Sequence, residues 1–283
     1  MPCGILSIML KELTQAETLE QLDLRGIETP SLESFAYLDR DVNIRYDWHA
    51  HDRHQLMYAF SGTLRLEAEN GVYLLPPQRA AWIPARVPHR STLHNVRSGS
   101  VFFAPDLVPT ELSGVRIISA APIVREMVRY SLRWPPTRDP ADRLANAFFR
   151  TLGMLCVEWI QEEMPFRLPA ARTGQVAVAM EYTLRNLETA TIEGAAAAAA
   201  LSARQFRRRF GAEAGIAWRQ FLHQARMLRA MELLVAPRAD ITGVAYAVGF
   251  NSLSAFAKSF TLFTGQTPSE FRRGRDGGAT VTP

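Results

Sequence analysis

Residues 240–271 read DITGVAYAVGFNSLSAFAKSFTLFTGQTPSEF, and a related stretch, TIEGAAAAAALSARQFRRRFGAEAGIAWRQF, occupies residues 191–221. The two stretches match at an offset of 49 residues and, after one inserted residue, of 50. The matching pairs are Ala196 and Ala245, Ala200 and Gly249, Leu201 and Phe250, Phe206 and Phe256, Arg208 and Lys258, Phe210 and Phe260, Gly215 and Gly265, and Phe221 and Phe271. Pairs that keep order, chemistry and a single shift indicate a duplicated supersecondary unit.

Each copy predicts a helix of about two turns, a tight turn and a second helix that ends at glycine, which is the plan of a helix-turn-helix. Ser202 and Gln205 have the spacing of a capping box, so we expect the backbone to occupy Gln205. The predicted caps and turns are Thr191, Ala200 and Ser202 in the first unit, and Asp240, Gly249 and Asn251 or Ser252 in the second.

The second helix of each unit has one face that must be buried. Phe206 and Phe210 are four residues apart, as are Phe256 and Phe260, so each pair faces the core. The outward faces then present Arg204, Arg207 and Arg208 in the first unit and Ser254, Ala255 and Lys258 in the second. Residues 171–283 hold 14 basic and 8 acidic side chains, whereas residues 1–170 hold 18 and 20, so an anionic partner is expected at the C-terminal part.

The segment from Trp218 to Leu234 contains no proline or glycine and predicts one helix of roughly 25 Å between the units. A rigid rod of this length can hold two recognition helices about one duplex turn apart on one face of DNA. The alternative is a helical bundle whose arginines are merely solvated.

The region from about Phe35 to Phe103 has the signals of strands and turns. Thr63 to Ala68 alternates apolar and polar residues, Asn70-Gly71 favours a two-residue hairpin turn, and Val72 to Leu75 can return as the partner strand. Pro76-Pro77, Pro84 and Pro88 divide the next part of the region into short extended pieces. We therefore expect an antiparallel sheet closed into a small barrel over residues 31–115.

Two helices are expected in residues 116–170. Pro122 suits the first position of one, with Ile123, Met127 and Tyr130 on one side, and it ends at Trp134-Pro135-Pro136. The other fits Pro140 to Glu163, with one stripe formed by Leu144, Phe148, Leu155 and Trp159. These stripes face either the core or a second copy of the chain, and periodicity alone leaves both readings open. Pro165 and Pro169 indicate a linker.

Residues 175–273 resemble the AraC/XylS family of bacterial transcription regulators. The most specific segments are Asp240-Ile241 through Phe250, Phe256 through Phe260, and Thr264-Gly265-Gln266-Thr267-Pro268-Ser269-Glu270-Phe271-Arg272. The N-terminal half is similar to the cupin-type sensor that precedes such domains, through His49-Ala50-His51-Asp52, Gln55 to Tyr58, Gly62 to Leu64, Ala81 to Pro84 and Pro88 to Arg90. The resemblance implies DNA contacts at the same six outward residues.

The first unit departs from the family pattern. A glycine is expected where Ala200 stands, a larger aliphatic residue where Ala195 stands, and a Ser/Thr-Pro pair where Ala217-Trp218 stands. An alanine forced to positive φ costs on the order of 1 kcal/mol. We therefore hypothesise that the first helix-turn-helix unit is less stable than the second and orders fully only on DNA. Ala200→Gly is then expected to raise the melting temperature of the isolated C-terminal domain.

The candidate effector site contains His49, His51, Gln55 and His89 as a hydrogen-bonding rim, with Tyr58 and Trp82 as apolar walls. His49 and His51 are two residues apart, so on a strand both point to one face. The alternatives are barrel polar groups without a ligand, or a cupin-type metal site. Gln55 stands where such metal sites usually offer a carboxylate, so we expect no metal and no other cofactor.

The whole chain predicts an α+β protein: a cupin-like antiparallel β-barrel followed by an all-α domain of two helix-turn-helix units joined by a long helix. Its 47% hydrophobic and 21% charged residues exclude a disordered or collagen-like chain. Two cysteines, Cys3 and Cys156, offer no disulfide framework or zinc finger, which fits a reducing compartment. Apolar runs are too short for a membrane helix and the start lacks a signal-peptide pattern, so a cytoplasmic protein without a membrane is expected.

We divide the chain into a leader of unclear role (1–30), the effector-sensing barrel (31–115), a helical dimerisation and linker region (116–170), the DNA-binding domain (171–274) and a tail (275–283). The predicted function is sequence-specific transcriptional regulation under control of a small-molecule effector. The predicted partners are an operator in double-stranded DNA, that effector, a second copy of the chain, and RNA polymerase as a further candidate. The rival is an enzyme, a cupin-type metal-dependent oxygenase or isomerase with an accessory helical domain.

Overall fold

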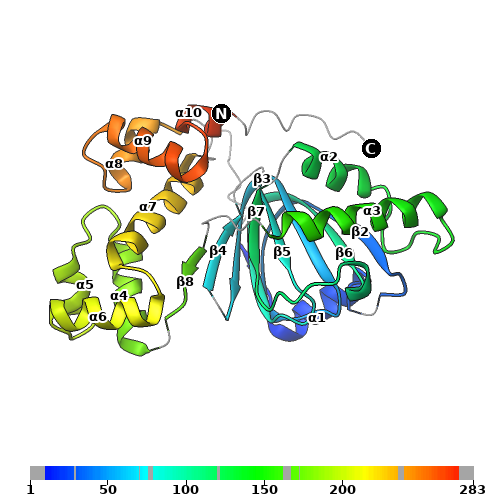
Figure 1. Ribbon diagram of the computed structural model, residues 1–283, viewed down its shortest axis with the longest axis horizontal. Coiled ribbons are helices and arrows are strands. Elements are labelled where there is room, and N and C mark those ends of the chain that lie inside the picture. The colour runs from blue at the N-terminus through cyan, green and yellow to red at the C-terminus, as the bar shows by residue number, and fades with distance from the viewer. Residues whose placement is uncertain are drawn as a thin grey trace, which may run out of the picture. The chain divides into compact units, whose positions relative to one another are not determined.

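The computed structural model describes residues 10–28, 30–69, 71–75, 79–119, 122–161, 167–171, 173–234 and 239–273. These residues divide into two units, one with 10–69 and 75–161 and the other with 71–74 and 167–273. The first unit is built on an antiparallel sheet and the second on helices, as the labelled ribbon shows (Figure 1). The predicted α+β class is therefore confirmed.

The sheet of the first unit is antiparallel apart from one short edge strand. Its strand order is β1-β2-β6-β3-β5-β7, and only β1 runs parallel to its neighbour. The strands are β1 (Lys11–Glu12), β2 (Ser34–His49), β3 (His54–Ala68), β5 (Arg79–Ile83), β6 (His89–Phe103) and β7 (Arg116–Ser119). A 3-10 turn, Pro105–Leu107, comes after β6.

The three long strands curve because their register is interrupted. Shifts occur between β2 and β6 at Asp39 to Ile44 and at Tyr46 to His49, and between β3 and β6 at Ala59 to Thr63. Such irregularities bend a strand and increase its twist. The sheet in Figure 1 rolls accordingly around an interior.

The two faces of the sheet have different cores because side chains alternate along each strand. Leu56, Val101 and Phe103 lie in a large apolar cluster with residues of two helices, α2 (Pro122–Ser131) and α3 (Arg143–Trp159). Figure 1 shows both helices over the sheet. On the other face, Phe35 and Phe102 stack with ring centroids 4.9 Å apart and pack with Leu22 and Ile27.

Both helices begin close to their predicted positions but bury a different face. Pro122 is the first residue of α2, and Asp142 caps α3 by accepting from the Ala145 amide. Val124, Val128 and Ser131 are the buried residues of α2, and those of α3 include Phe149, Leu152 and Cys156. The predicted stripes lie beside this face: Ile123 is 53% exposed and Leu144 is 59% exposed. Met127, Phe148 and Trp159 of the same stripes are partly buried and pack against the core cluster, so the stripes lie at the edge of the core face.

Two domain boundaries differ from those predicted. Residues 116–119, which we assigned to the helical region, form β7 and pair with β5, because Ile117 and Ile118 are fully buried in the sheet. Most of the predicted leader belongs to the same unit: β1 pairs with β2, and α1 (Gln15–Leu24) is capped by Thr14 and packs on β2. A two-residue strand has no period that a sequence could reveal.

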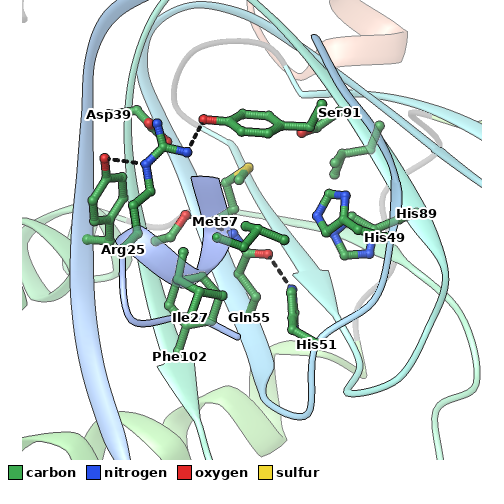
Figure 2. Close-up of a pocket in the computed structure, with 15 residues that line it drawn as sticks. Arg25, Ile27, Asp39, His49, His51, Gln55, Met57, His89, Ser91 and Phe102 are labelled. Atoms are coloured by element: carbon green, nitrogen blue, oxygen red, sulfur yellow. Dashed lines mark hydrogen bonds between the residues drawn. The ribbon is translucent and has the colours of Figure 1, made fainter. Parts of the chain in front are cut away.

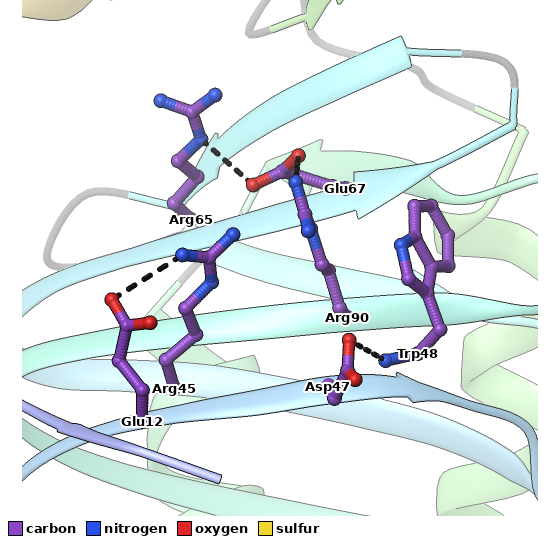
Figure 3. A network of polar contacts seen from close by, with 7 residues as sticks. All are labelled: Glu12, Arg45, Asp47, Trp48, Arg65, Glu67 and Arg90. Atoms are coloured by element: carbon purple, nitrogen blue, oxygen red, sulfur yellow. Dashed lines mark hydrogen bonds and ion pairs between the residues drawn. The ribbon is translucent and has the colours of Figure 1, made fainter. Parts of the chain in front are cut away.

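The outer surface near β1 is held by ion pairs. Arg90 contacts Glu67 at 2.6 Å, Arg65 contacts Glu67 at 3.3 Å, and Arg45 of β2 contacts Glu12 of β1 at 3.4 Å (Figure 3). The Arg45–Glu12 pair joins β1 to β2 at the surface, and exposed pairs of this kind contribute about 0–1 kcal/mol. The Arg90–Glu67 pair joins β6 to β3 and is more buried, with 26% and 15% of the two side chains exposed.

The second unit contains seven helices in its described residues: α4 (Gly174–Arg185), α5 (Ile192–Ala198), α6 (Ala203–Ala214), α7 (Trp218–Leu234), α8 (Ile241–Ala247), α9 (Leu253–Thr264) and α10 (Pro268–Arg273). Two short strands, β4 (Gly71–Leu75) and β8 (Arg167–Pro169), pair with each other at residues of this unit. Helices α5 and α8 have 7 residues each and α6 and α9 have 12 each.

The duplication extends to the packing of the cores. Phe206 and Phe210 have ring centroids 5.4 Å apart, and Phe256 and Phe260 are 5.5 Å apart. The ring centroids of Phe210 and Phe221 are 5.4 Å apart, and those of their repeat equivalents Phe260 and Phe271 are the same distance apart. The predicted helix-turn-helix pair, joined by a helix over Trp218 to Leu234, is thus present.

Some predicted features lie outside the described residues: the turn at Asn70, Pro76-Pro77, Pro165, the first nine residues of the leader and the tail 275–283. Both arms of the predicted hairpin are strands, β3 and β4. None of the helices in the described ranges has the length and apolar character needed to cross a membrane.

Candidate DNA interface and ligand pocket

Helices α6 and α9 present polar faces to solvent. Arg204, Arg207 and Arg208 are exposed on α6, and Ser254, Ala255 and Lys258 are exposed on α9. The opposite face of each helix carries its two fully buried phenylalanines. The six residues thus lie where the repeat places them, and their contact with DNA stays a prediction.

Neighbouring polar residues on α6 are engaged within the protein. Gln205 accepts from the Ser202 amide at 3.1 Å and completes the capping box. Arg209 donates to Gln175 of α4. These contacts leave Arg204, Arg207 and Arg208 as the arginines of α6 available to an external partner.

The turns and caps set the angle between the helices of each unit. Ala200 has φ of 53° and Gly249 has φ of 83°, so both turn residues are left-handed. Thr191, Ser202 and Asp240 are the N-caps of α5, α6 and α8. In α9 the cap is Ser252, which accepts from the Ala255 amide at 3.3 Å; Asn251 lies one residue ahead and does not cap.

A pocket opens on the inner face of the sheet in the first unit (Figure 2). About 430 Å³ of empty space lies within it, part of which is open to solvent. Its lining residues are Leu22, Arg25, Ile27, Tyr37, Asp39, Tyr46, His49, His51, Gln55, Met57, Leu66, His89, Ser91, Ser100 and Phe102. Four of the six predicted effector residues, the three histidines and Gln55, are among them.

The three histidines form one cluster. Ring centroids of His49 and His89 are 4.3 Å apart, and those of His51 and His89 are 5.1 Å apart. His49 ends β2 and faces His89 in register across to β6. His51 lies beyond the strand, in the loop before β3, so it joins the cluster through the loop and not through strand alternation as we expected.

Each histidine is oriented by the backbone. Nδ1 of His49, His51 and His89 lies 2.7, 2.7 and 2.9 Å from the carbonyl oxygens of Asp47, Arg53 and Val87. A carbonyl can only accept, so in His49 and His89 Nδ1 carries the proton and Nε2 is the acceptor of the neutral imidazole. In His51 both ring nitrogens face carbonyl oxygens, because Nε2 lies 3.1 Å from the side-chain oxygen of Gln55.

The histidines are neutral at physiological pH. Burial lowers the pKa of His49 to about 4, and burial also lowers the pKa of His51 and, with the neighbouring histidines, that of His89. The described residues contain no group of three or more His, Cys, Asp or Glu side chains arranged to hold a metal ion. The cluster therefore presents hydrogen-bond acceptors to the pocket.

Tyr58 and Trp82 do not line this pocket, so that part of the prediction is wrong. Both are buried in the cluster formed with α2 and α3 on the other face of the sheet. Gln55 and Tyr58 are three residues apart on β3 and therefore point to opposite faces. Trp82 pairs with Leu56 and shares the Tyr58 face.

The opposite end of the pocket contains residues that sequence patterns did not indicate. Arg25, which comes directly after α1, donates from Nε to the Tyr37 hydroxyl at 2.7 Å and from Nη1 to the Tyr46 hydroxyl. Asp39 is buried beside them, and burial raises its pKa to about 6 even though Arg25 opposes this shift. In the sequence, Arg25 stands two positions before Ile27 in the predicted leader, and this pattern is too common to indicate a functional residue.

Two family models match the chain. The model of an AraC-like ligand binding domain matches residues 31–167, and that of a helix-turn-helix domain matches residues 195–274. Together they span most of both structural units.

Two curated relatives are similar to this chain over most of its length, and a third is similar over about a quarter of it. The HTH-type transcriptional regulator NimR of Escherichia coli K12 is 27% identical over 228 residues, covering 79% of this chain and 81% of the relative. The uncharacterized HTH-type transcriptional regulator YobQ of Bacillus subtilis 168 is 24% identical, covering 86% and 95%. The transcriptional activator RhaS of Escherichia coli O139:H28 is 31% identical over 77 residues, covering 27% of this chain and 28% of RhaS.

Solved structures with similarity include the DNA-binding domain of AdpA in complex with a target DNA, which is 30% identical, covers 39% of this chain and 100% of that chain, and has a TM-score of 0.36. ToxT from Vibrio cholerae O395 is 12% identical and covers 86% of this chain and 98% of its own, with a TM-score of 0.38.

Proposed function

This chain belongs to the AraC/XylS family of DNA-binding transcriptional regulators, and from that premise we propose that α6 and α9 bind an operator while a small molecule in the sheet pocket controls the binding. The observation that carries the proposal is the matched pair of exposed helix faces, each opposite two buried phenylalanines. Arg204, Arg207 and Arg208 contact one segment of the major groove, and Ser254, Ala255 and Lys258 the next.

The linker helix supports simultaneous contact. Helix α7 has 17 residues, which is roughly 25 Å of helix. It contacts both helix-turn-helix units through buried residues. Phe221 of α7 packs on Phe210 of the first helix-turn-helix unit. Nδ1 of His223, also in α7, lies 3.5 Å from the Ser259 hydroxyl of the second. A continuous helix anchored at both ends keeps two recognition helices at one spacing.

Mutation of the two central basic residues tests the interface. Arg208→Ala and Lys258→Ala should each weaken binding to sites selected from random DNA by about 1–3 kcal/mol if the side chain reads a base. If the side chain contacts only phosphate, the salt dependence of the DNA affinity should decrease without a loss of sequence specificity. Arg185→Ala is the matched control, because Arg185 is exposed on α4 and ion-paired with Glu181. Unchanged affinity in both interface variants would contradict the assignment of these faces.

We propose that the chain acts as a dimer through α2 and α3. Ile123 and Tyr130 of α2 are 53% and 46% exposed, and Leu144 of α3 is 59% exposed. Tyr130 and Phe148 have ring centroids 5.3 Å apart, which joins the two stripes into one apolar surface. Of the two readings of these stripes, their exposure favours the dimer.

We propose that the protein works by binding and not by catalysis, in the cytoplasm where its DNA target lies, and that RNA polymerase is a partner once it is on DNA. The matching curated relatives are transcriptional regulators. Operator affinity should be unchanged by a metal chelator, and the purified chain should contain well below one metal ion per molecule. Stoichiometric metal would favour the oxygenase or isomerase instead.

A further inference from the structure

One end of the pocket offers hydrogen-bond donors in excess. Arg25 uses Nε and Nη1 to donate to the hydroxyls of Tyr37 and Tyr46, so both phenol oxygens are already accepting. Each phenol still has its own O–H to donate, and neither O–H donates a hydrogen bond to any of the residues that the structure describes. The guanidinium carbon lies 5.2 and 5.3 Å from the two ring centroids, which holds the cation in place.

The other end offers acceptors in excess. His49 and His89 donate from Nδ1 to backbone carbonyls, so each has an Nε2 lone pair left to accept with. In His51 the corresponding nitrogen lies 3.1 Å from the side-chain oxygen of Gln55, so we do not count it among the acceptors open to a ligand. Both remaining imidazoles are uncharged because burial lowers their pKa.

An apolar stretch separates the two ends. Figure 2 shows Arg25 and Asp39 on one side of the pocket, His49 and His89 on the other, and Met57 between them. Ile27 and Phe102 add to this apolar part of the lining. A ligand that fits must therefore carry an acceptor at one end, a donor at the other and a short apolar body between them.

Arg25 makes a charged acceptor the best complement. A guanidinium binds a carboxylate through charge-assisted hydrogen bonds that are about twice as strong as neutral ones. Asp39 competes for that charge, but its carboxyl is buried, and burial raises its pKa to about 6, so it is protonated more readily than an exposed carboxylate when a second anion enters.

We propose that the effector is a small carboxylic acid whose carboxylate lies against Arg25, Tyr37 and Tyr46. Its far end carries either a hydroxyl, which donates to His49 or to His89, or an amino group, which can donate to both. The proposal deepens the proposed function, because it rests on this pocket being the effector site. It assigns to Arg25 the choice of an anion and to the two histidines the choice of a donor.

The test uses the full chain and a panel of small hydroxy- and amino-carboxylic acids of roughly 6 to 15 non-hydrogen atoms, graded in size so that the length of the apolar body is also tested. Each acid is paired with its uncharged primary amide and with the acid lacking the distal donor, as in 4-hydroxybenzoate, 4-hydroxybenzamide and benzoate. Thermal shift identifies binders, and calorimetry measures their affinity. At least one acid should bind saturably, and its amide should bind roughly 10- to 100-fold more weakly.

Two variants locate the binding. Arg25→Gln should weaken the acid about 10- to 100-fold while leaving the amide unchanged, and Asp39→Asn should strengthen the acid by removing the competing carboxylate. Arg45→Gln is the matched control, because Arg45 forms an exposed pair with Glu12. If Arg25→Gln does not fold, the comparison of acid and amide on the wild-type chain decides the question.

The proposal is overturned if amides bind as tightly as acids, if only neutral or cationic compounds bind, or if no acid in the panel binds. Binding of selected DNA by the same preparation is measured in parallel. A chain that binds DNA but no acid contradicts this inference alone, whereas a chain that selects no DNA sequence contradicts the proposed function itself.

Discussion

Ala200 and Gly249 occupy equivalent turns but meet different surroundings. Both have positive φ, which costs a non-glycine residue on the order of 1 kcal/mol. Ala200 is exposed, so its methyl group is accommodated. A Cβ on Gly249 would lie 2.5 Å from Nη2 of Arg226 and 2.7 Å from the Glu188 carbonyl oxygen. An alanine can therefore replace the family's turn glycine in the first helix-turn-helix unit but not in the second.

Exchanging these residues should have opposite effects on stability. Ala200→Gly should stabilise the helical unit by about 1 kcal/mol, because it removes the cost of left-handed backbone without losing a contact. Gly249→Ala should destabilise it by more than this, because strain and steric overlap add. Thermal unfolding of the full chain measures both. An unchanged or lower melting temperature for Ala200→Gly would refute the idea that the first unit is weakened at its turn.

His49 should make the sheet unit sensitive to acid. Its pKa is about 4 in the folded chain because of burial and about 6.5 when unfolded, so the unfolded state binds the proton first. Stability is complete above pH 6.5 and falls as the pH drops toward 4, by about 1–2 kcal/mol at pH 5 from this residue alone. Urea unfolding between pH 7 and 5 checks this, and His49→Gln should reduce the slope. A flat profile in the wild-type chain would exclude the effect.

The alternation of side chains between the two faces of a strand determines which pocket residues could be predicted from the sequence. The separation of Gln55 and Tyr58 already places them on opposite faces, so parity applied consistently would have rejected Tyr58. His51 could not be assigned in this way, because it lies in a loop. Arg25 was out of reach, since a contact between the leader and Tyr46 depends on tertiary structure that no local pattern encodes.

Among the elements, α7 is joined to both helix-turn-helix units by Arg226. Its Nε donates to the Leu187 carbonyl at 2.9 Å and its Nη2 to the Glu188 carbonyl at 3.3 Å, both in the connection between α4 and α5. The same guanidinium lies against the Gly249 turn between α8 and α9. One side chain therefore touches parts of both units, and its burial lowers its pKa.

Removal of Arg226 should loosen the spacing between the recognition helices. Selection from random DNA with the wild-type chain should yield two sequence elements at one separation. With Arg226→Ala the same elements should appear at a broader range of separations, and affinity should fall. Arg229→Ala is the control, because Arg229 is on the same helix and pairs only with the exposed Glu232 side chain. A single unchanged separation would assign Arg226 to stability alone.

Element type and repeat length were predictable, and the buried side of a helix was less so. The duplicated pattern predicted α6 and α9, because phenylalanines four residues apart define the buried face of a short helix. The absence of proline and glycine predicted α7. In α3 the fully buried residues are Ala145, Phe149, Leu152 and Cys156, which lie beside the predicted stripe. When two neighbouring apolar stripes share one helix, periodicity cannot say which one faces the sheet.

For the whole molecule, the exposed residues of α2 and α3 support the proposal that the chain forms a dimer. Ile123, Tyr130 and Leu144 are large apolar side chains left about half exposed on helices whose other face is fully buried. Contiguous apolar surface of this kind marks an interaction site. A homodimer buries the same patch on both chains, so one substitution alters the interface twice.

Leu144→Arg should therefore shift the full chain from dimer to monomer without unfolding it. Each interface would place two new charges against apolar surface, and an unpaired charge there costs several kcal/mol. Sedimentation velocity measures the association state, and circular dichroism verifies the fold. Met154→Arg is a demanding control, because Met154 is 62% exposed on the same helix but lies off the stripe. Equal behaviour of the two variants, or a monomeric wild-type chain, would place the dimer contact elsewhere or remove it. If monomers form, affinity for a single selected site should persist while affinity for paired sites falls, because linked binding contributes only when both copies are joined.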